Sequence, residues 1–72
     1  MPTTENIVRK KEREEIIYRR ADELARSGKY KEWRSIELAL RHEGFLEARQ
    51  LLDSGFLRQE LNKMCNQALR ML

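Results

Sequence analysis

Two side chains in this sequence have the chemistry of nucleophilic catalysis, the single cysteine and the single histidine. A cysteine activated by a histidine base is a common nucleophile. Cys65, however, falls on the apolar stripe of its helical segment, where a thiol behaves as a small hydrophobic side chain. His42 falls in the last turn of another segment, where positive charge suits the helix dipole. We therefore expect structural roles for both residues and no enzymatic activity.

Motifs that would hold a cofactor, a metal or a small substrate are also missing from the sequence. It contains no glycine-rich phosphate loop, no nucleophile elbow and no spacing typical of metal ligands. A chain of 8.7 kDa also has little volume for a ligand pocket, which typically occupies about 300–1,000 Å³. We expect no cofactor, no metal and no small-molecule substrate.

A row of arginines in the N-terminal half is the strongest sign of nucleic-acid binding. Arg9, Arg13 and Arg20 fall within about 40° of one another on a helical wheel. The whole net charge of +3 falls in residues 5–34, which hold ten Lys and Arg but only seven Asp and Glu. Such a row could follow a line of phosphates. The alternative is an ordinary solvated helix face.

Residues 33–52 form a second candidate nucleic-acid site. Two short helical segments joined at a glycine suggest a helix-turn-helix. On the second segment, Arg49 could read a guanine edge and Gln50 an adenine edge. Glu47 and Asp53 lie beside them, and two acids on so short a segment oppose the approach of phosphates. Nucleic-acid binding is therefore the alternative function.

Apolar residues outside the core-facing stripes predict protein–protein contacts. Val8, Ile16 and Leu38 lie off the main apolar faces of their segments, as does Leu46. In a small chain, whose core rarely supplies more than ~3–5 kcal/mol of net stability, such residues favour a partner or a second copy. We expect a small helical accessory protein that binds an unidentified protein or forms a homodimer, with contacts at Val8, Ile16 and Leu38.

Helical periodicity divides the chain into four segments, with ends near Gly28, Gly44 and Gly55. Their expected ranges are about 4–27, 31–43, 46–54 and 56–71. The fourth has the clearest pattern, because its apolar residues recur at the spacing of one helix face. Glycine and proline are scarce, while good helix formers abound.

Two of the three glycines carry a specific helix-ending pattern. When Gly44 is taken as the first residue past a helix, Leu40 and Phe45 occupy the positions whose side chains meet in a Schellman motif. The same relation returns around Gly55, with Leu51 and Phe56. We expect a left-handed glycine at both positions.

These segments predict an all-α fold, a small compact bundle of four helices with long first and last helices and a short third. We expect one domain over residues 1–72, with residues 1–15 projecting or partly frayed. The predicted core consists of Ile17, Ala21, Leu24, Trp33, Ile36, Leu40, Phe45, Ala48, Leu51, Leu52, Phe56, Leu57, Leu61, Met64, Cys65 and Ala68.

The cellular location follows from what the sequence does not contain. No apolar run approaches the ~20 residues of a membrane span, so no membrane partner is expected. A single cysteine and the absence of an export signal predict the cytoplasm.

Overall fold

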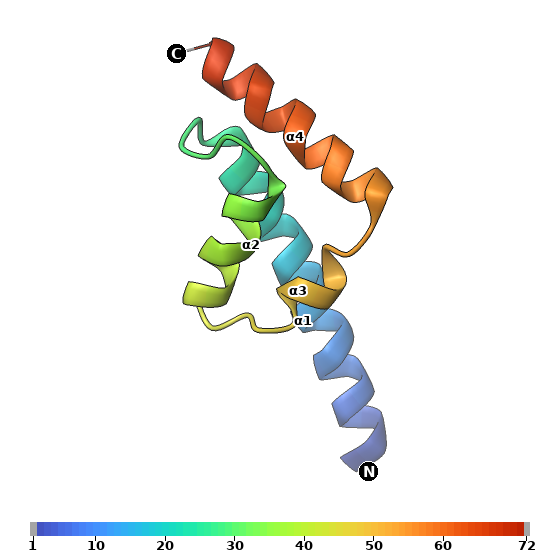
Figure 1. The fold of residues 1–72 in the computed structure, drawn as a ribbon. Helices are drawn as coiled ribbons and strands as arrows, with labels where there is room; N and C mark the ends of the chain where they lie inside the picture. The colour runs from blue at the N-terminus through green and yellow to red at the C-terminus, as the bar shows by residue number, and fades with distance from the viewer. Residues whose placement is uncertain (1, 72) are drawn as a thin grey trace.

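The computed structural model describes the backbone of residues 2–71 and the side chains of residues 10–71. Within that range the chain is all-α, with four helices and no strand (Figure 1). The helices are α1 (Pro2–Arg26), α2 (Trp33–His42), α3 (Ala48–Leu51) and α4 (Gly55–Arg70). The predicted fold class is confirmed, because the first and last helices are long and the third is a single turn.

Helix α1 is the element on which the bundle is built. It contacts α4 and α2, and α2 also packs against α3 and α4. Figure 1 shows the N-terminal part of α1 extending beyond the other helices, so that the two ends of the chain lie far apart. The molecule measures 49 × 21 × 16 Å. Its long dimension follows from α1, whose 25 residues span roughly 37 Å at 1.5 Å per residue.

The core lies where the C-terminal half of α1 meets the other three helices. Among the described side chains, the buried apolar residues are Ile17, Ala21, Leu24, Ala25, Ile36, Leu40, Ala48, Leu52, Leu61 and Cys65. Six other residues of the predicted core are partly buried: Trp33, Phe45, Leu51, Leu57, Met64 and Ala68. Ala25, which lies beside the apolar stripe of α1, is also buried. Tyr30 and Ala39 pack against the core although neither is in the predicted core.

The end of α2 has the predicted geometry. Gly44 has a φ of 97°, in the left-handed region that favours glycine. The Phe45 N–H donates to the Leu40 carbonyl and the Gly44 N–H donates to the Arg41 carbonyl, each at 3.0 Å. These are the two hydrogen bonds of a Schellman motif, and Phe45 packs against the core.

The geometry predicted at Gly55 is wrong. Gly55 has no positive φ and is the first residue of α4, not a left-handed residue after α3. Helix α3 has already ended at Leu51, and Ser54 caps the next helix by accepting the Leu57 N–H at 3.4 Å. Phe56, predicted to lie in the core, is consequently 75 % exposed in the first turn of α4.

A residue of α4 caps the start of α2. The Trp33 N–H donates to the Asn62 Oδ1 at 2.8 Å, whereas Glu32, at the N-cap position, makes no side-chain cap of its own. The first turn of a helix leaves backbone N–H groups unpaired, and Asn62 satisfies one of them across the helix interface. This hydrogen bond joins the first residue of α2 to the side of α4.

Candidate protein interface

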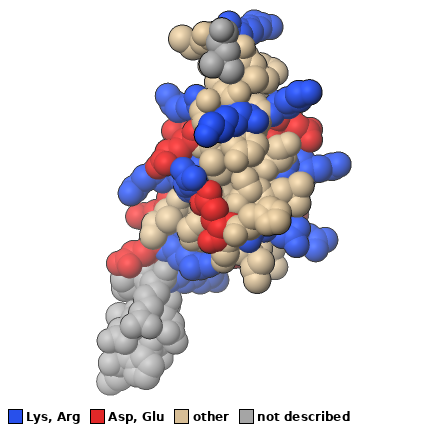
Figure 2. Space-filling model, turned by 90° about the vertical axis from the view of Figure 1, so that its left-hand side faces the viewer, with Lys and Arg blue, Asp and Glu red and all other residues tan. Residues whose placement is uncertain are grey.

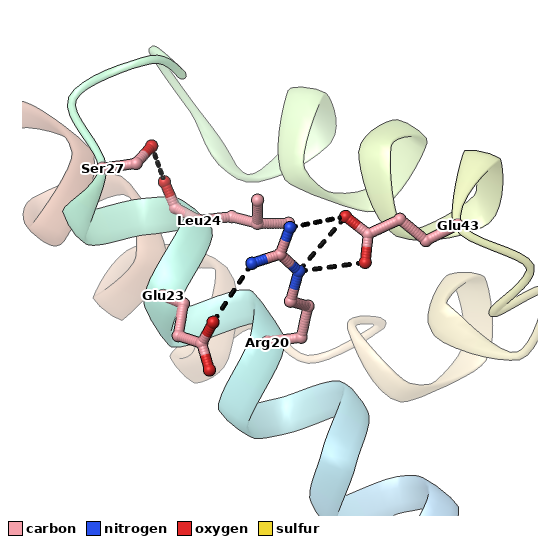
Figure 3. A network of polar contacts seen from close by, with 5 residues as sticks. All are labelled: Arg20, Glu23, Leu24, Ser27 and Glu43. Atoms are coloured by element: carbon pink, nitrogen blue, oxygen red, sulfur yellow. Dashed lines mark hydrogen bonds and ion pairs between the residues drawn. The ribbon is translucent and has the colours of Figure 1, made fainter.

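Two of the three arginines in the predicted row, Arg13 and Arg20, form ion pairs with glutamates of the same molecule. Arg20 on α1 donates from Nε and Nη2 to the Glu43 carboxylate, at distances of 2.9 to 3.2 Å. Its third nitrogen, Nη1, donates to Glu23 at 3.1 Å, so one guanidinium holds two carboxylates (Figure 3). Paired in this way, Arg20 has a raised pKa and Glu43 a lowered one, in each case mainly through their hydrogen bonds.

Arg13 makes a parallel set of contacts two turns earlier on α1. Its Nη2 donates to the Gly44 carbonyl at 2.8 Å, its Nε donates to the Glu47 carboxylate, and its Cζ lies 5.0 Å from the centre of the Phe45 ring. The hydrogen bond from Arg13 lowers the pKa of Glu47. Two arginines of α1 therefore contact the turn that follows α2: Arg20 pairs with Glu43 at its start, and Arg13 pairs with Glu47 at its end.

The remaining predicted nucleic-acid contacts are Arg9, Arg49 and Gln50. The Arg9 side chain lies outside the described residues. Arg49 and Gln50 are exposed on α3, as expected of residues that could meet a partner. Helix α3, however, has only four residues, so the second helix of the expected helix-turn-helix is a single turn.

Two exposed leucines mark an apolar surface on the outer side of α2. Leu38 is 48 % exposed and Leu46, in the loop after α2, is 70 % exposed. Leu38 and His42 line two shallow surface hollows of about 490 and 270 Å³. The larger is also lined by Tyr30, Ser35, Ala39 and Glu43, and the smaller by Arg41 and Leu46. We call the surface formed by Tyr30, Leu38, His42 and Leu46 the α2 face.

Figure 2 views the molecule from the side on which α2 lies in Figure 1. Uncharged residues fill much of the middle of this view, and Lys and Arg side chains project around much of its edge. Charged side chains of both signs also cross the view left of its centre, so the uncharged area lies among charged groups. Protein-binding surfaces commonly combine an apolar area with polar surroundings.

The three residues assigned to a partner from sequence lie in different places. Leu38 is at the centre of the α2 face. Ile16 is 48 % exposed on α1 and lines neither hollow. The Val8 side chain lies outside the described residues. Leu46 was grouped with the off-face apolar residues on sequence alone but was assigned no contact, and His42 was not included. His42 lies four residues after Leu38, one helical turn, and this spacing was a usable signal.

The cysteine and the histidine occupy unlike surroundings. Cys65 is fully buried in the core, and this burial, followed by the charge of Glu32, raises the pKa of its thiol. His42 is exposed on the α2 face. Among the described residues, no three His, Cys, Asp or Glu side chains come together where they could hold a metal ion.

Nothing in the described part of the chain has both the length and the apolar character that a membrane-crossing helix needs. No protein-family model, curated protein or solved structure matches the sequence.

Proposed function

We propose that this chain is a small, non-enzymatic helical accessory protein that acts through protein–protein contacts, and that the α2 face is its binding surface. The observation that carries the proposal is the pair of adjoining hollows centred on Leu38 and His42. Leu38, which lines both hollows, and Leu46, which lines the smaller, are exposed by 48 % and 70 %. Grouped apolar residues on a surface favour a protein partner.

The alternative, nucleic-acid binding, has weaker support. Arg13 and Arg20 would have to leave Glu47 and Glu43 before they could contact phosphates. Arg49 and Gln50 remain exposed, but they project from a single turn of helix, whereas a recognition helix places several side chains along the major groove. Titration with duplex and single-stranded DNA at about 50 mM salt tests this alternative, since phosphate contacts are strongest at low salt.

Site-specific crosslinking tests the proposed function. A photoreactive amino acid at position 38 of the full chain, expressed in its native cells, should form a covalent adduct with a protein. The matched control carries the same amino acid at Gln59, an exposed position on α4. Adding Leu46→Asp to the position-38 protein should remove the adduct, while adding Leu69→Asp should not.

The same experiment distinguishes a foreign partner from a second copy. An adduct of twice the chain mass, together with a dimer in sedimentation, would indicate homodimerisation through the α2 face. If position 38 gives no more adduct than position 59 and the native chain sediments as a monomer, the proposal fails. We expect the chain to act in the cytoplasm, on the ground of its single cysteine.

A further inference from the structure

The charge around the α2 face indicates the chemical class of its partner. Residues 29–49, which contain α2 and its flanking loops, hold five Lys and Arg against four Glu. The near balance in number does not describe the charge that the surface presents, because most of these acids form ion pairs and some of the bases do not.

Three of the four acids are paired with arginines of the same molecule. Glu43 and Glu47 pair with Arg20 and Arg13, which reach them from α1. Glu37 lies 4.0 Å from Arg41, and its side chain is only 12 % exposed. Glu43 lines the larger hollow, but its charge there is offset by Arg20. Pairing therefore reduces the negative charge that these three carboxylates present to a molecule that approaches α2.

The fourth acid, Glu32, precedes α2 at the N-cap position and is not among the residues that line the two hollows.

Two of the bases, Arg34 and Arg41, lie on α2 before and after the exposed Leu38. Arg34, Leu38 and Arg41 are separated by four and three residues, so they lie along one side of α2. Within the described residues Arg34 takes part in no ion pair; its guanidinium lies 5.6 Å from the Trp33 ring, an arrangement that leaves its positive charge uncompensated. Arg41 lines the smaller hollow and has only the long contact to Glu37.

We infer that the α2 face binds an acidic amphipathic helix, whose apolar side chains enter the hollows beside Leu38 and whose carboxylates meet Arg34 and Arg41. This inference rests on the proposed function and adds the class of partner. Apolar anchors spaced along one helix face suit two adjoining hollows, and complementary charge fixes the orientation of the bound helix. Nucleic acid is disfavoured, because the exposed Leu38 and Leu46 and the carboxylate of Glu43 lie where phosphates would have to approach.

Two synthetic helical peptides test the inference directly. Both have about 18 residues, long enough to form helices in water, and an identical leucine face; one carries glutamates beside that face and the other carries lysines. Each is titrated into the ¹⁵N-labelled full chain. The glutamate peptide should shift the amide resonances of Leu38, His42 and Leu46, with a Kd about tenfold or more below that of the lysine peptide. Raising NaCl from about 50 to about 500 mM should narrow this difference.

Charge-reversal variants provide the matched control. Arg34→Glu combined with Arg41→Glu should reverse the preference, so that the lysine peptide binds more tightly. Lys63→Glu combined with Arg70→Glu changes the net charge equally but on α4, and it should leave the preference unchanged. Leu38→Glu should abolish binding of both peptides, while Leu69→Glu should not. Far-UV circular dichroism of each variant checks that it is folded.

Several outcomes would overturn the inference. These are equal or tighter binding of the lysine peptide, resonance shifts confined to other surfaces, stronger shifts of the same amides by duplex DNA, or a homodimer that buries Leu38. If crosslinking from position 38 captures a protein but the glutamate peptide does not bind, then the proposed function stands and the acidic helix is the wrong class of partner.

Discussion

Arg20 donates two hydrogen bonds to the Glu43 carboxylate, from Nε to Oε1 and from Nη2 to Oε2, each at 2.9 Å. The two residues lie 23 positions apart, one in the C-terminal half of α1 and the other at the C-cap of α2. An acid at the C-terminal end of a helix faces the negative end of the helix dipole, which is unfavourable. Arg20 offsets this by placing a cation beside the carboxylate, as Figure 3 shows.

The first prediction concerns stability in acid. The pKa values of Glu43 and Glu47 are lowered in the folded chain by hydrogen bonds from Arg20 and Arg13. A lowered carboxyl pKa contributes stability that is fully present above the unfolded value of about 4.3 and is lost as pH falls through the lower folded value. Urea unfolding should therefore give a stability that declines below about pH 4.3.

Neutral variants check the origin of that decline. Glu43→Gln combined with Glu47→Gln should be less stable than the native chain at pH 7 and should lose less stability on acidification. Glu47→Gln alone should cost about 0.2–1 kcal/mol at pH 7, the range of a solvent-exposed ion pair. Glu60→Gln is the control, since Glu60 pairs only within α4, with Lys63 at 3.8 Å. An acid profile of the double variant that parallels the native one would refute this explanation.

The second prediction contrasts two glycines that sequence reasoning treated alike. Gly44→Ala should destabilise the chain by about 1–2 kcal/mol, because a side chain is strained at the φ of 97°. Gly55→Ala should leave stability unchanged or raise it by up to about 1 kcal/mol, because Gly55 is already helical. No atom lies within 4 Å of an added Cβ at either position, so backbone conformation alone should decide the outcome. Thermal unfolding measures both, and equal Tm values would contradict the assigned geometry.

Local patterns were sufficient to predict most of the fold. Apolar spacing predicted all four helices, and the Leu40–Gly44–Phe45 relation predicted both hydrogen bonds that end α2. The prediction failed at Gly55 because a second local signal competed with the first. Ser54 is a favourable N-cap, and it starts α4 at the residue where the Schellman pattern would have ended α3.

The candidate site could be predicted only in part. Leu38 was identified because it lies off its helix's apolar stripe, a property that the sequence contains. The pairing of Arg13 and Arg20 with Glu47 and Glu43 could not be found in this way, because it depends on how α1 packs against the turn after α2. A helical wheel shows that the two arginines share a face of α1, but it does not show what lies opposite that face.

The third prediction concerns the cap that α4 supplies to α2. Asn62→Ala removes the acceptor of the Trp33 N–H and should destabilise the chain by about 0.5–2 kcal/mol, as loss of a helix cap does. Asn66→Ala, one turn later on α4 and exposed, should have little effect. Urea unfolding followed by the fluorescence of the single tryptophan measures both variants. Equal stabilities would show that water replaces the Asn62 oxygen without cost.

The fourth prediction uses Cys65 as an internal probe of the core. Its side chain is fully buried and its pKa is raised, chiefly by that burial, so an aromatic disulfide reagent at neutral pH should modify the native thiol slowly and the urea-unfolded thiol quickly. The rate should rise with pH, since the thiolate is the reacting form. A thiol that reacts equally fast in both states would show that Cys65 is accessible, and it would reopen the question of a catalytic role.

A core substitution makes the last prediction quantitative. Leu52 is fully buried, and Leu52→Ala should cost about 2–5 kcal/mol. That loss is comparable with the ~3–5 kcal/mol that a core of this size supplies, so the variant should be largely or partly unfolded at 25 °C. Labelling of Cys65 should then accelerate about tenfold or more, because each 1.4 kcal/mol lost raises the open population about tenfold. Leu46→Ala, at an exposed position on the α2 face, should leave the labelling rate unchanged. Equal rates for the two variants would mean that the reagent reaches Cys65 through a local opening that does not involve the core around Leu52.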